Sequence, residues 1–161
     1  PFAGKNVSVM TPYLSSITTN QMVGYLQDDL TAQGAEVNVI DTANDFSVLA
    51  SRIEDVTAAG TDAIVLVSAD PTQLENQLRE AMDAGIPVFG VDATDVAKDL
   101  INNGYMVGTI KQDNVGMADA VATITANLIA GKENKFEGLN ENYVIVDNWF
   151  VQIPYAVYTG E

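Results

Sequence analysis

Apolar and polar positions along the chain form blocks that predict strands and helices in alternation. Short apolar runs, of which 63–67 is the clearest, are typical of parallel strands that are covered on both faces. Between these runs, apolar residues recur at helical spacing, as at Met22, Leu26 and Leu30. A glycine such as Gly34 follows each such stripe and ends the predicted helix. The predicted strands are 7–10, 37–40, 63–67, 87–91, 105–110, 143–146 and 149–153. The predicted helices run from 19 to 34, 48 to 60, 68 to 85 and 117 to 131, and 92–95 leads into a further short helix through Leu100 that stops at Gly104.

This alternation predicts an α/β fold, because strands joined by helical crossovers form a parallel sheet. We expect an open, doubly wound parallel sheet of five or six strands with helices on both faces. The length of 161 residues suits one domain, and no linker divides the chain. We therefore predict a single α/β domain over 1–161, with 132–161 forming a polar loop and a terminal strand segment.

The charge of the chain excludes several classes of partner. There are 22 acidic and 7 basic residues, and the difference, 22 − 7 = 15, gives a net charge of −15. Such a chain is repelled by phosphate backbones and anionic lipids, so we expect no nucleic-acid partner. No apolar run approaches ~20 residues, so we expect no membrane-embedded segment. No charged-then-apolar leader precedes the first strand, so we also expect any export signal to be absent from this chain.

The residue types that are missing exclude much of catalysis. Cysteine and histidine are both absent, which removes thiolate chemistry, disulfides, histidine-based catalysis and zinc sites of the usual kind. No pair of base and nucleophile stands out among the remaining residues. Although carboxylates could still hold a metal, 132–142 lacks the alternating pattern of a calcium loop. We expect no enzyme activity, no catalytic residue, no cofactor and no metal site.

Polar residues follow the predicted strands, at the sheet edge where open parallel sheets bind ligands. This edge is rich in hydroxyl, amide and carboxylate groups, and Lys111 is the one base close to it. A neutral polyol suits such an edge because carboxylates accept hydrogen bonds from hydroxyls. The alternative for Asp41, Asp70 and Asp95 is helix capping, which aspartate favours. The residues concerned are Thr11, Tyr13, Asp41, Ser68, Asp70, Asp92, Gln112 and Asp113.

The segment Ala84–Ala93, with the sequence AGIPVFGVDA, resembles periplasmic glucose/galactose-binding proteins and their ribose-binding relatives. The resemblance continues through Gln112 and returns at Val151–Tyr155, and 60–71 is similar to the N-terminal lobe of that family. It implies a sugar-binding lobe of a transport receptor, with a flavodoxin-like strand order. It also implies that Asp92 and Gln112, twenty residues apart, hydrogen-bond the sugar; for Asp92 the alternative is helix capping. The position of Tyr13 is similar to that of an aromatic residue after the family's first strand.

The chain departs from this family in having length for one lobe, whereas the family closes two lobes around the sugar. A single open edge predicts weak binding, because each hydrogen bond to the sugar replaces one to water. We therefore expect self-association, with a homodimer or a higher oligomer meeting edge to edge to rebuild a cleft. The resemblance further implies an ABC permease as a possible partner and an extracytoplasmic location.

Two other functions stay open at this point. One is a self-associating structural domain with little or no affinity for sugar. The other is a flavodoxin-like FMN carrier, which shares the size, the acidity and the fold class. That function would need 11–19 to hold a phosphate, and this loop contains no glycine that would let the backbone approach one closely. The sequence does not determine which sugar is bound.

Overall fold

The computed structural model describes residues 2–160, which form two compact units. The first unit runs up to Ile110 and takes in the residues from Val157 onward, and the second is Lys111–Ala156. Two compact units can still fold cooperatively, so the prediction of a single domain over 1–161 stays a prediction.

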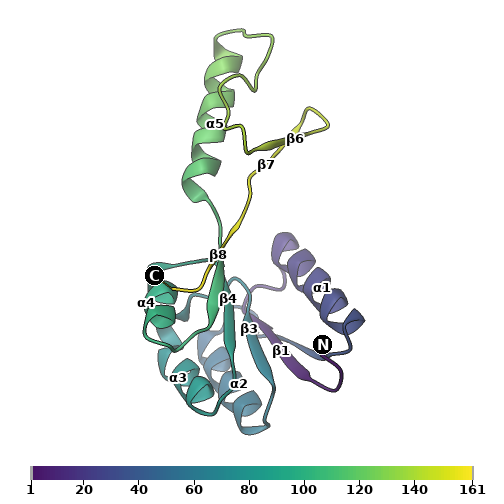
Figure 1. Cartoon of the computed structure of the whole chain (residues 1–161), viewed down its shortest axis with the longest axis vertical. Coiled ribbons are helices and arrows are strands. Elements are labelled where there is room, and N and C mark those ends of the chain that lie inside the picture. The colour runs from purple at the N-terminus through teal and green to yellow at the C-terminus, as the bar shows by residue number, and fades with distance from the viewer. Residues whose placement is uncertain (1, 161) are drawn as a thin grey trace. The chain divides into compact units, whose positions relative to one another are not determined.

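A six-stranded sheet lies at the centre of the first unit (Figure 1). The strands are β1 (Asn6–Thr11), β2 (Glu36–Asp41), β3 (Ala63–Leu66), β4 (Val88–Val91), β5 (Gly108–Lys111) and β8 (Ala156–Tyr158). They lie in the order β2-β1-β3-β4-β5-β8, and the pairs from β2 to β5 are parallel. The chain switches direction across the sheet between β1 and β3, as in flavodoxin-like folds. The predicted open parallel sheet is confirmed.

Apolar side chains project from both faces of the sheet and form two separate hydrophobic cores. The helices of this unit are α1 (Ile17–Ala32), α2 (Phe46–Ala58), α3 (Glu75–Asp83) and α4 (Asp95–Asn102), with a 3₁₀ turn, η1, at Pro71–Gln73. Since neighbouring residues of a strand point to opposite faces, Val9 and Met10 enter different cores. Val9 packs with Val23 of α1, while Met10 packs with residues of α2, α3 and α4. Figure 1 shows α1 beside β1.

Two element predictions need correction, and one strand was not predicted. The helix expected from 68 starts later, because Asp70 caps the 3₁₀ turn η1 and α3 begins only at Glu75. The strand expected over 105–110 starts at Gly108, since Met106 points into the core from the connection that follows α4. The strand β8 was not predicted, because three residues after Pro154 give too short a pattern to detect.

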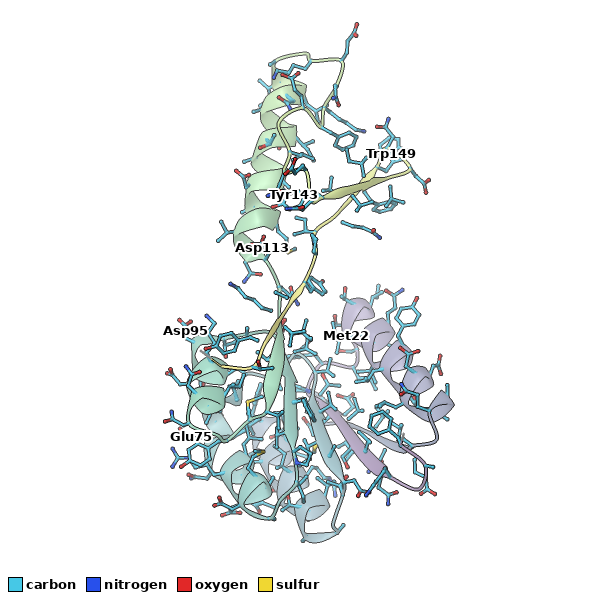
Figure 2. The ribbon with its side chains drawn as sticks, viewed as in Figure 1. Met22, Glu75, Asp95, Asp113, Tyr143 and Trp149 are labelled. Atoms are coloured by element: carbon cyan, nitrogen blue, oxygen red, sulfur yellow. The ribbon has the colours of Figure 1, made fainter. Side chains whose placement is uncertain are left out.

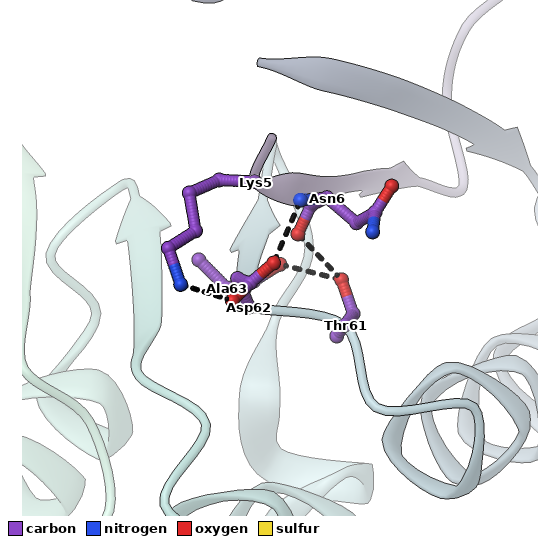
Figure 3. Close-up of polar contacts among 5 residues, drawn as sticks. All are labelled: Lys5, Asn6, Thr61, Asp62 and Ala63. Carbon is purple, nitrogen blue, oxygen red and sulfur yellow. Dashed lines mark hydrogen bonds and ion pairs between the residues drawn. The ribbon is translucent and has the colours of Figure 1, made fainter. Parts of the chain in front are cut away.

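A polar cluster joins the amino-terminal ends of β1 and β3 (Figure 3). Lys5 Nζ lies 2.7 Å from Asp62 Oδ1, and the backbone N–H of Asn6 donates to Asp62 Oδ2 at 2.8 Å. Thr61 Oγ1 donates to the Asn6 carbonyl at 3.0 Å. The hydrogen bond from Lys5 holds the pKa of Asp62 below its usual value. These contacts fix the start of the register between the two central strands.

The second unit contains α5 (Asn114–Ile129) and a hairpin of β6 (Val144–Val146) and β7 (Phe150–Gln152). Buried Asn127 donates from Nδ2 to the carbonyls of Lys135 and Glu137, which ties the polar loop to the helix. Tyr143 and Asp113 lie together near the start of α5 (Figure 2). Desolvation, followed by the charges of Asp113 and Asp119, raises the pKa of Tyr143. The hairpin turn uses Asp147 and Asn148 with positive φ, as twisted hairpins favour.

The cap of α2 yields a pH prediction. Asp45 accepts hydrogen bonds from the Ser47 hydroxyl and from the N–H groups of Ser47 and Val48, and these hold its pKa below its usual value. Because the pKa is depressed on folding, the stabilisation is present above the unfolded pKa and is lost as pH falls through the folded pKa. At neutral pH, Asp45→Ala should lower Tm by roughly 2–4 °C. The gap to wild type, measured by circular dichroism, should narrow as pH approaches 2.

The control for that experiment is Asp45→Asn, which keeps a capping side chain but does not titrate. At neutral pH we expect Asp45→Asn to keep most of the stabilisation that the cap provides. Because asparagine does not titrate, the Tm difference between this variant and wild type should change as the pH falls. A gap between wild type and Asp45→Ala that stays constant from neutral pH to pH 2 would contradict the proposed role of the carboxylate.

Candidate functional site

The carboxyl ends of β1 to β4 converge on one edge of the first unit, which carries the candidate site. The register pairs Leu66 of β3 with Gly90 of β4. Ser68 and Asp92 each follow by two positions, so both lie at the carboxyl edge, after neighbouring strands. Both side chains are half-buried. The structure therefore places two of the residues that the sequence singled out at the ends of adjacent strands.

The backbone at this edge adopts left-handed conformations that side chains other than glycine rarely take. Ser68 has φ 55° and Asp92 has φ 82°, while Ala43 and Asn44, which follow β2, have φ 48° and 68°. These are all the left-handed non-glycine residues among the described positions of the first unit. Each such conformation costs on the order of 1–3 kcal/mol, and such residues cluster at functional sites. The concentration of strain at one edge marks that edge as the site.

Hydroxyl groups and backbone bonds connect the loops of this edge. Buried Thr19 of α1 donates from Oγ1 to Ser68 Oγ at 3.4 Å. The N–H of Thr42 donates to the Thr11 carbonyl at 3.1 Å, and the N–H of Asn44 donates to the Pro12 carbonyl at 2.6 Å. The Thr42 hydroxyl is buried and has no hydrogen-bond partner. The loops after β1, β2 and β3 are thus held in one arrangement.

Tyr13 lies in the loop after β1 and presents an aromatic ring at the edge. Its ring meets Phe46 edge-on, with centroids 6.3 Å apart and an interplanar angle of 68°. Phe46 is the first residue of α2, so the contact braces the loop against that helix. Tyr13 remains 37% exposed, which leaves part of the residue open to a ligand. Sugars stack on partly exposed aromatic faces of this kind.

The acidic residues at this edge differ in the structural roles of their carboxylates. Asp70 Oδ1 accepts from the N–H and hydroxyl of Thr72 and caps η1, as the structural alternative predicted. Asp41 Oδ1 accepts from the N–H of Ala43 in the loop after β2, and the cap of α2 is Asp45 rather than Asp41. The ligand role of Asp70 stays a prediction. Asp95 does not cap α4, because Thr94 accepts from the Ala97 N–H. Asp95 instead pairs with Lys98 at 2.9 Å, which lowers its pKa.

Thr94 is the N-cap residue of α4, so Asp92 does not hold that position. The N–H of Asp92 donates to the carbonyl of Ile110 at 3.0 Å, which extends the pairing of β4 and β5 beyond the last residue of β4. Gln112 belongs to the second unit, is half-buried and stands between β5 and α5. The joint role of Asp92 and Gln112 in holding a ligand stays a prediction.

Thr19 is the site residue that sequence reasoning missed. It had been expected only as a start of the first helix, whereas α1 begins at Ile17 and places Thr19 on its inner face. The signal was present in the spacing, because Thr19, Val23 and Leu26 follow one another at i, i+4 and i+7. A threonine within a stripe of inward-facing apolar residues indicates that its hydroxyl contacts another polar group in the interior of the fold.

The chemistry of the edge favours hydroxyl-rich, uncharged ligands. Asp92 supplies a carboxylate acceptor, and Ser68 supplies a hydroxyl that both donates and accepts.

Over residues 2–160, no group of three acidic side chains is placed to hold a metal ion. In the same part of the chain, no helix combines the length and the apolar character needed to cross a membrane.

Comparisons with known proteins agree with this architecture. A family model described as a periplasmic binding protein domain matches residues 7–92, just over half of the chain. The ribose import binding protein of Bacillus subtilis is 26% identical over 107 residues, covering 62% of this chain and 35% of its own length. The D-galactose/methyl-galactoside binding periplasmic protein of Haemophilus influenzae is 30% identical over 115 residues, covering 67% of this chain and 35% of its own length.

A solved structure supports the same assignment. An ABC transporter solute binding protein from Clostridium phytofermentans, determined with bound β-D-glucose, superposes with a TM-score of 0.65 at 25% identity. The match covers 80% of this chain and 38% of that protein, and the chain spans about a third of the length of the curated relatives named above. The matched family consists of binding domains rather than enzymes, as expected from the sequence. This chain belongs to the family of periplasmic binding protein domains.

Proposed function

We propose that the carboxyl edge of the first unit binds a monosaccharide and acts, without catalysis, as part of an ABC-transport solute receptor. The observation that carries this proposal is the concentration of strained, non-glycine residues at one edge, with Ser68 and Asp92 following adjacent strands. Strain of this kind persists where the surrounding structure holds a ligand-binding arrangement. The relatives, whose names state ribose and galactose, support a sugar as the ligand.

Each residue has a role that follows from its chemistry. Asp92 accepts hydrogen bonds from sugar hydroxyls, and Ser68 donates or accepts beside it. Tyr13 offers the exposed part of its ring to an apolar face of the sugar. Gln112 adds an amide that both donates and accepts, and Asp70 uses the carboxylate oxygen that does not cap η1. An extracytoplasmic location and an ABC permease as partner are parts of this proposal, and both rest on the relatives.

The affinity of this edge alone is weak. Hydrogen bonds exchanged with water contribute about 0.5–1.5 kcal/mol each, and the loss of rigid-body freedom opposes them. Four or five such bonds give roughly 2–7.5 kcal/mol before that opposing cost, so the net does not exceed about 4 kcal/mol and the Kd is about 1 mM or weaker. Hydrogen bonds to the charged carboxylate of Asp92 contribute more than bonds to neutral groups, about 1.5–3 kcal/mol each. The removal of that charge is therefore the most informative single change.

Titration calorimetry with glucose, galactose and ribose tests the proposal. We expect a saturable heat signal with at least one sugar and a Kd of about 1 mM. Asp92→Asn should weaken it by about tenfold or more, because a charged acceptor is lost. Asp95→Asn is the matched control, since it removes the same charge three residues away, on the exposed start of α4. Flat traces with all three sugars, or equal heats from Asp92→Asn and wild type, would refute the proposed role.

A self-associating structural domain is the second candidate, favoured by one observation that lies away from the candidate site. The sheet of the first unit has an uncovered apolar face, which a soluble chain rarely leaves exposed. The flavin-carrier alternative is not taken further, because the family is one of binding proteins. Association edge to edge stays a prediction.

A further inference from the structure

One face of the sheet in the first unit forms an apolar groove of about 320 Å³. The groove lies over β3, β4 and β5, and none of its lining residues carries a charge. Phe89 and Val107 on its rim are 38% and 39% exposed, and Val157 of β8 is 73% exposed. Its main apolar lining residues are Leu26, Val65, Phe89, Val91, Val107 and Val157.

Among the residues that the structure describes, no helix of the first unit covers that groove. Helices α2, α3 and α4 supply the core on the opposite face, where Ile64, Leu66 and Val88 point. On the groove side, α1 packs against β2 and the side chains of β1, and reaches the groove only through Leu26. Parallel sheets occur almost only with both faces covered, because their strands are apolar on both sides. The groove therefore lacks the helix that a doubly wound sheet requires.

The second unit has a helix with the matching property. Along α5, Met117, Val121 and Leu128 follow one another at i, i+4 and i+11 and form one stripe. These side chains are 45%, 66% and 58% exposed. Asp119 is the one charged residue of the helix, and it lies on a different side from this stripe. A helix of 16 residues is about 24 Å long, enough to cross three strands spaced about 4.8 Å apart.

We propose that a second copy of this chain covers the groove, with α5 of each copy packed against the sheet of the other. Each copy carries both halves of the contact, so two copies satisfy both surfaces at once in a two-fold dimer. Chains with a net charge of −15 repel one another, so a stable contact has to use surfaces without charge. The groove and the α5 stripe both meet this condition.

The connection that leads into α5 suits such an exchange. Only Gln112 and Asp113 separate the last residue of β5 from the first residue of α5. Short connections of this kind favour the exchange of an element between copies over its return to the same chain. The inferred dimer uses the sheet face rather than the carboxyl edge. It does not depend on sugar binding, so either proposal can fail without the other.

Cross-linking of cysteine variants tests the proposal directly, because the natural chain contains no cysteine. One variant carries Val107→Cys on the groove and another carries Val121→Cys on α5. A short bismaleimide should link the two variants when they are mixed, and should link either variant alone much less. Val107→Cys mixed with Asn76→Cys, which lies on exposed α3 at the opposite face, is the control and should give little product.

The double variant Val107→Cys/Val121→Cys distinguishes the two possible sources of α5. Covalent dimers and higher products on a denaturing gel support exchange between copies. A link within one chain, giving a monomer of altered mobility, would overturn the proposal because α5 would then come from the same chain. Masses of the linked species, measured by mass spectrometry, separate these outcomes.

Sedimentation provides the second, independent readout. We expect wild type to dimerise, and Val121→Asp to weaken the dimer at least tenfold because it places a charge in the contact. Val121 is 66% exposed in the single chain, so this change should leave the circular dichroism spectrum unaltered. Asn76→Asp adds the same charge on α3 and should leave the dimer intact. A strictly monomeric wild type at high concentration would overturn the proposal.

Discussion

Ile64→Ala is expected to lower the free energy of unfolding by about 3–4 kcal/mol, as is typical when a fully buried aliphatic side chain is truncated. Ile64 has no exposed surface and lies in β3, between β1 and β4. Its side chain belongs to the core shared by the sheet, α2, α3 and α4. The truncation removes transfer free energy and leaves a cavity that neighbouring strands cannot close, because both are held in register. Urea unfolding followed by circular dichroism measures the change.

Ile17→Ala is the matched control, because it makes the same chemical change at a side chain that is 78% exposed on α1. We expect its effect to stay within about 0.5 kcal/mol of wild type. Equal losses from the two variants would contradict the placement of the core. An unchanged slope of free energy against urea is expected for both variants, since the change affects packing rather than the surface exposed on unfolding.

Gly90→Val is expected to cost about 2–3 kcal/mol through overpacking. Gly90 is buried in β4, and a Cβ there would lie 2.9 Å from Met106 Cε and 3.1 Å from Thr109 Oγ1. Met106 ends in a flexible thioether that can move, but Thr109 sits on the adjacent strand β5 and cannot. The Thr109 hydroxyl is buried without a hydrogen-bond partner, and the added methyl groups of valine cannot provide one. Thermal unfolding should show a lower Tm by roughly 5–10 °C.

Gly24→Val serves as the control for Gly90→Val. Gly24 lies within α1, and a Cβ there meets nothing within 4 Å. Because valine has a higher helix propensity than glycine, this variant should be as stable as wild type or slightly more stable. A Gly90→Val protein that unfolds at the wild-type temperature would show that β4 and β5 are less closely packed than the structure has them.

The placement of strain explains why the candidate site can be recognised without a bound ligand. Ser68 and Asp92 take conformations that their own side chains disfavour, and neighbouring hydrogen bonds hold them there. Such strain lowers stability, so a protein keeps it where it positions groups for a ligand. Asp70 differs, because its backbone is extended and its carboxylate already caps η1. Among the predicted site residues, Asp92 and Ser68 therefore carry the strongest structural support.

The amino-acid pattern alone determined the order of strands and helices up to β7, the parallel sheet and the helix ends at glycine, because these depend on local periodicity and backbone conformation. Gly34 and Gly85, for example, have φ of 98° and 81° as predicted. Only the tertiary structure decided which aspartates cap helices, that Thr19 contacts Ser68, and that Ser68 and Asp92 follow strands that are neighbours in the sheet. Those facts depend on register between strands that are distant in sequence, and a side chain's role there is set by neighbours that no local pattern specifies. Only the tertiary structure likewise shows that one face of β3, β4 and β5 is uncovered. The sequence of an apolar strand is the same whether or not a helix packs against it.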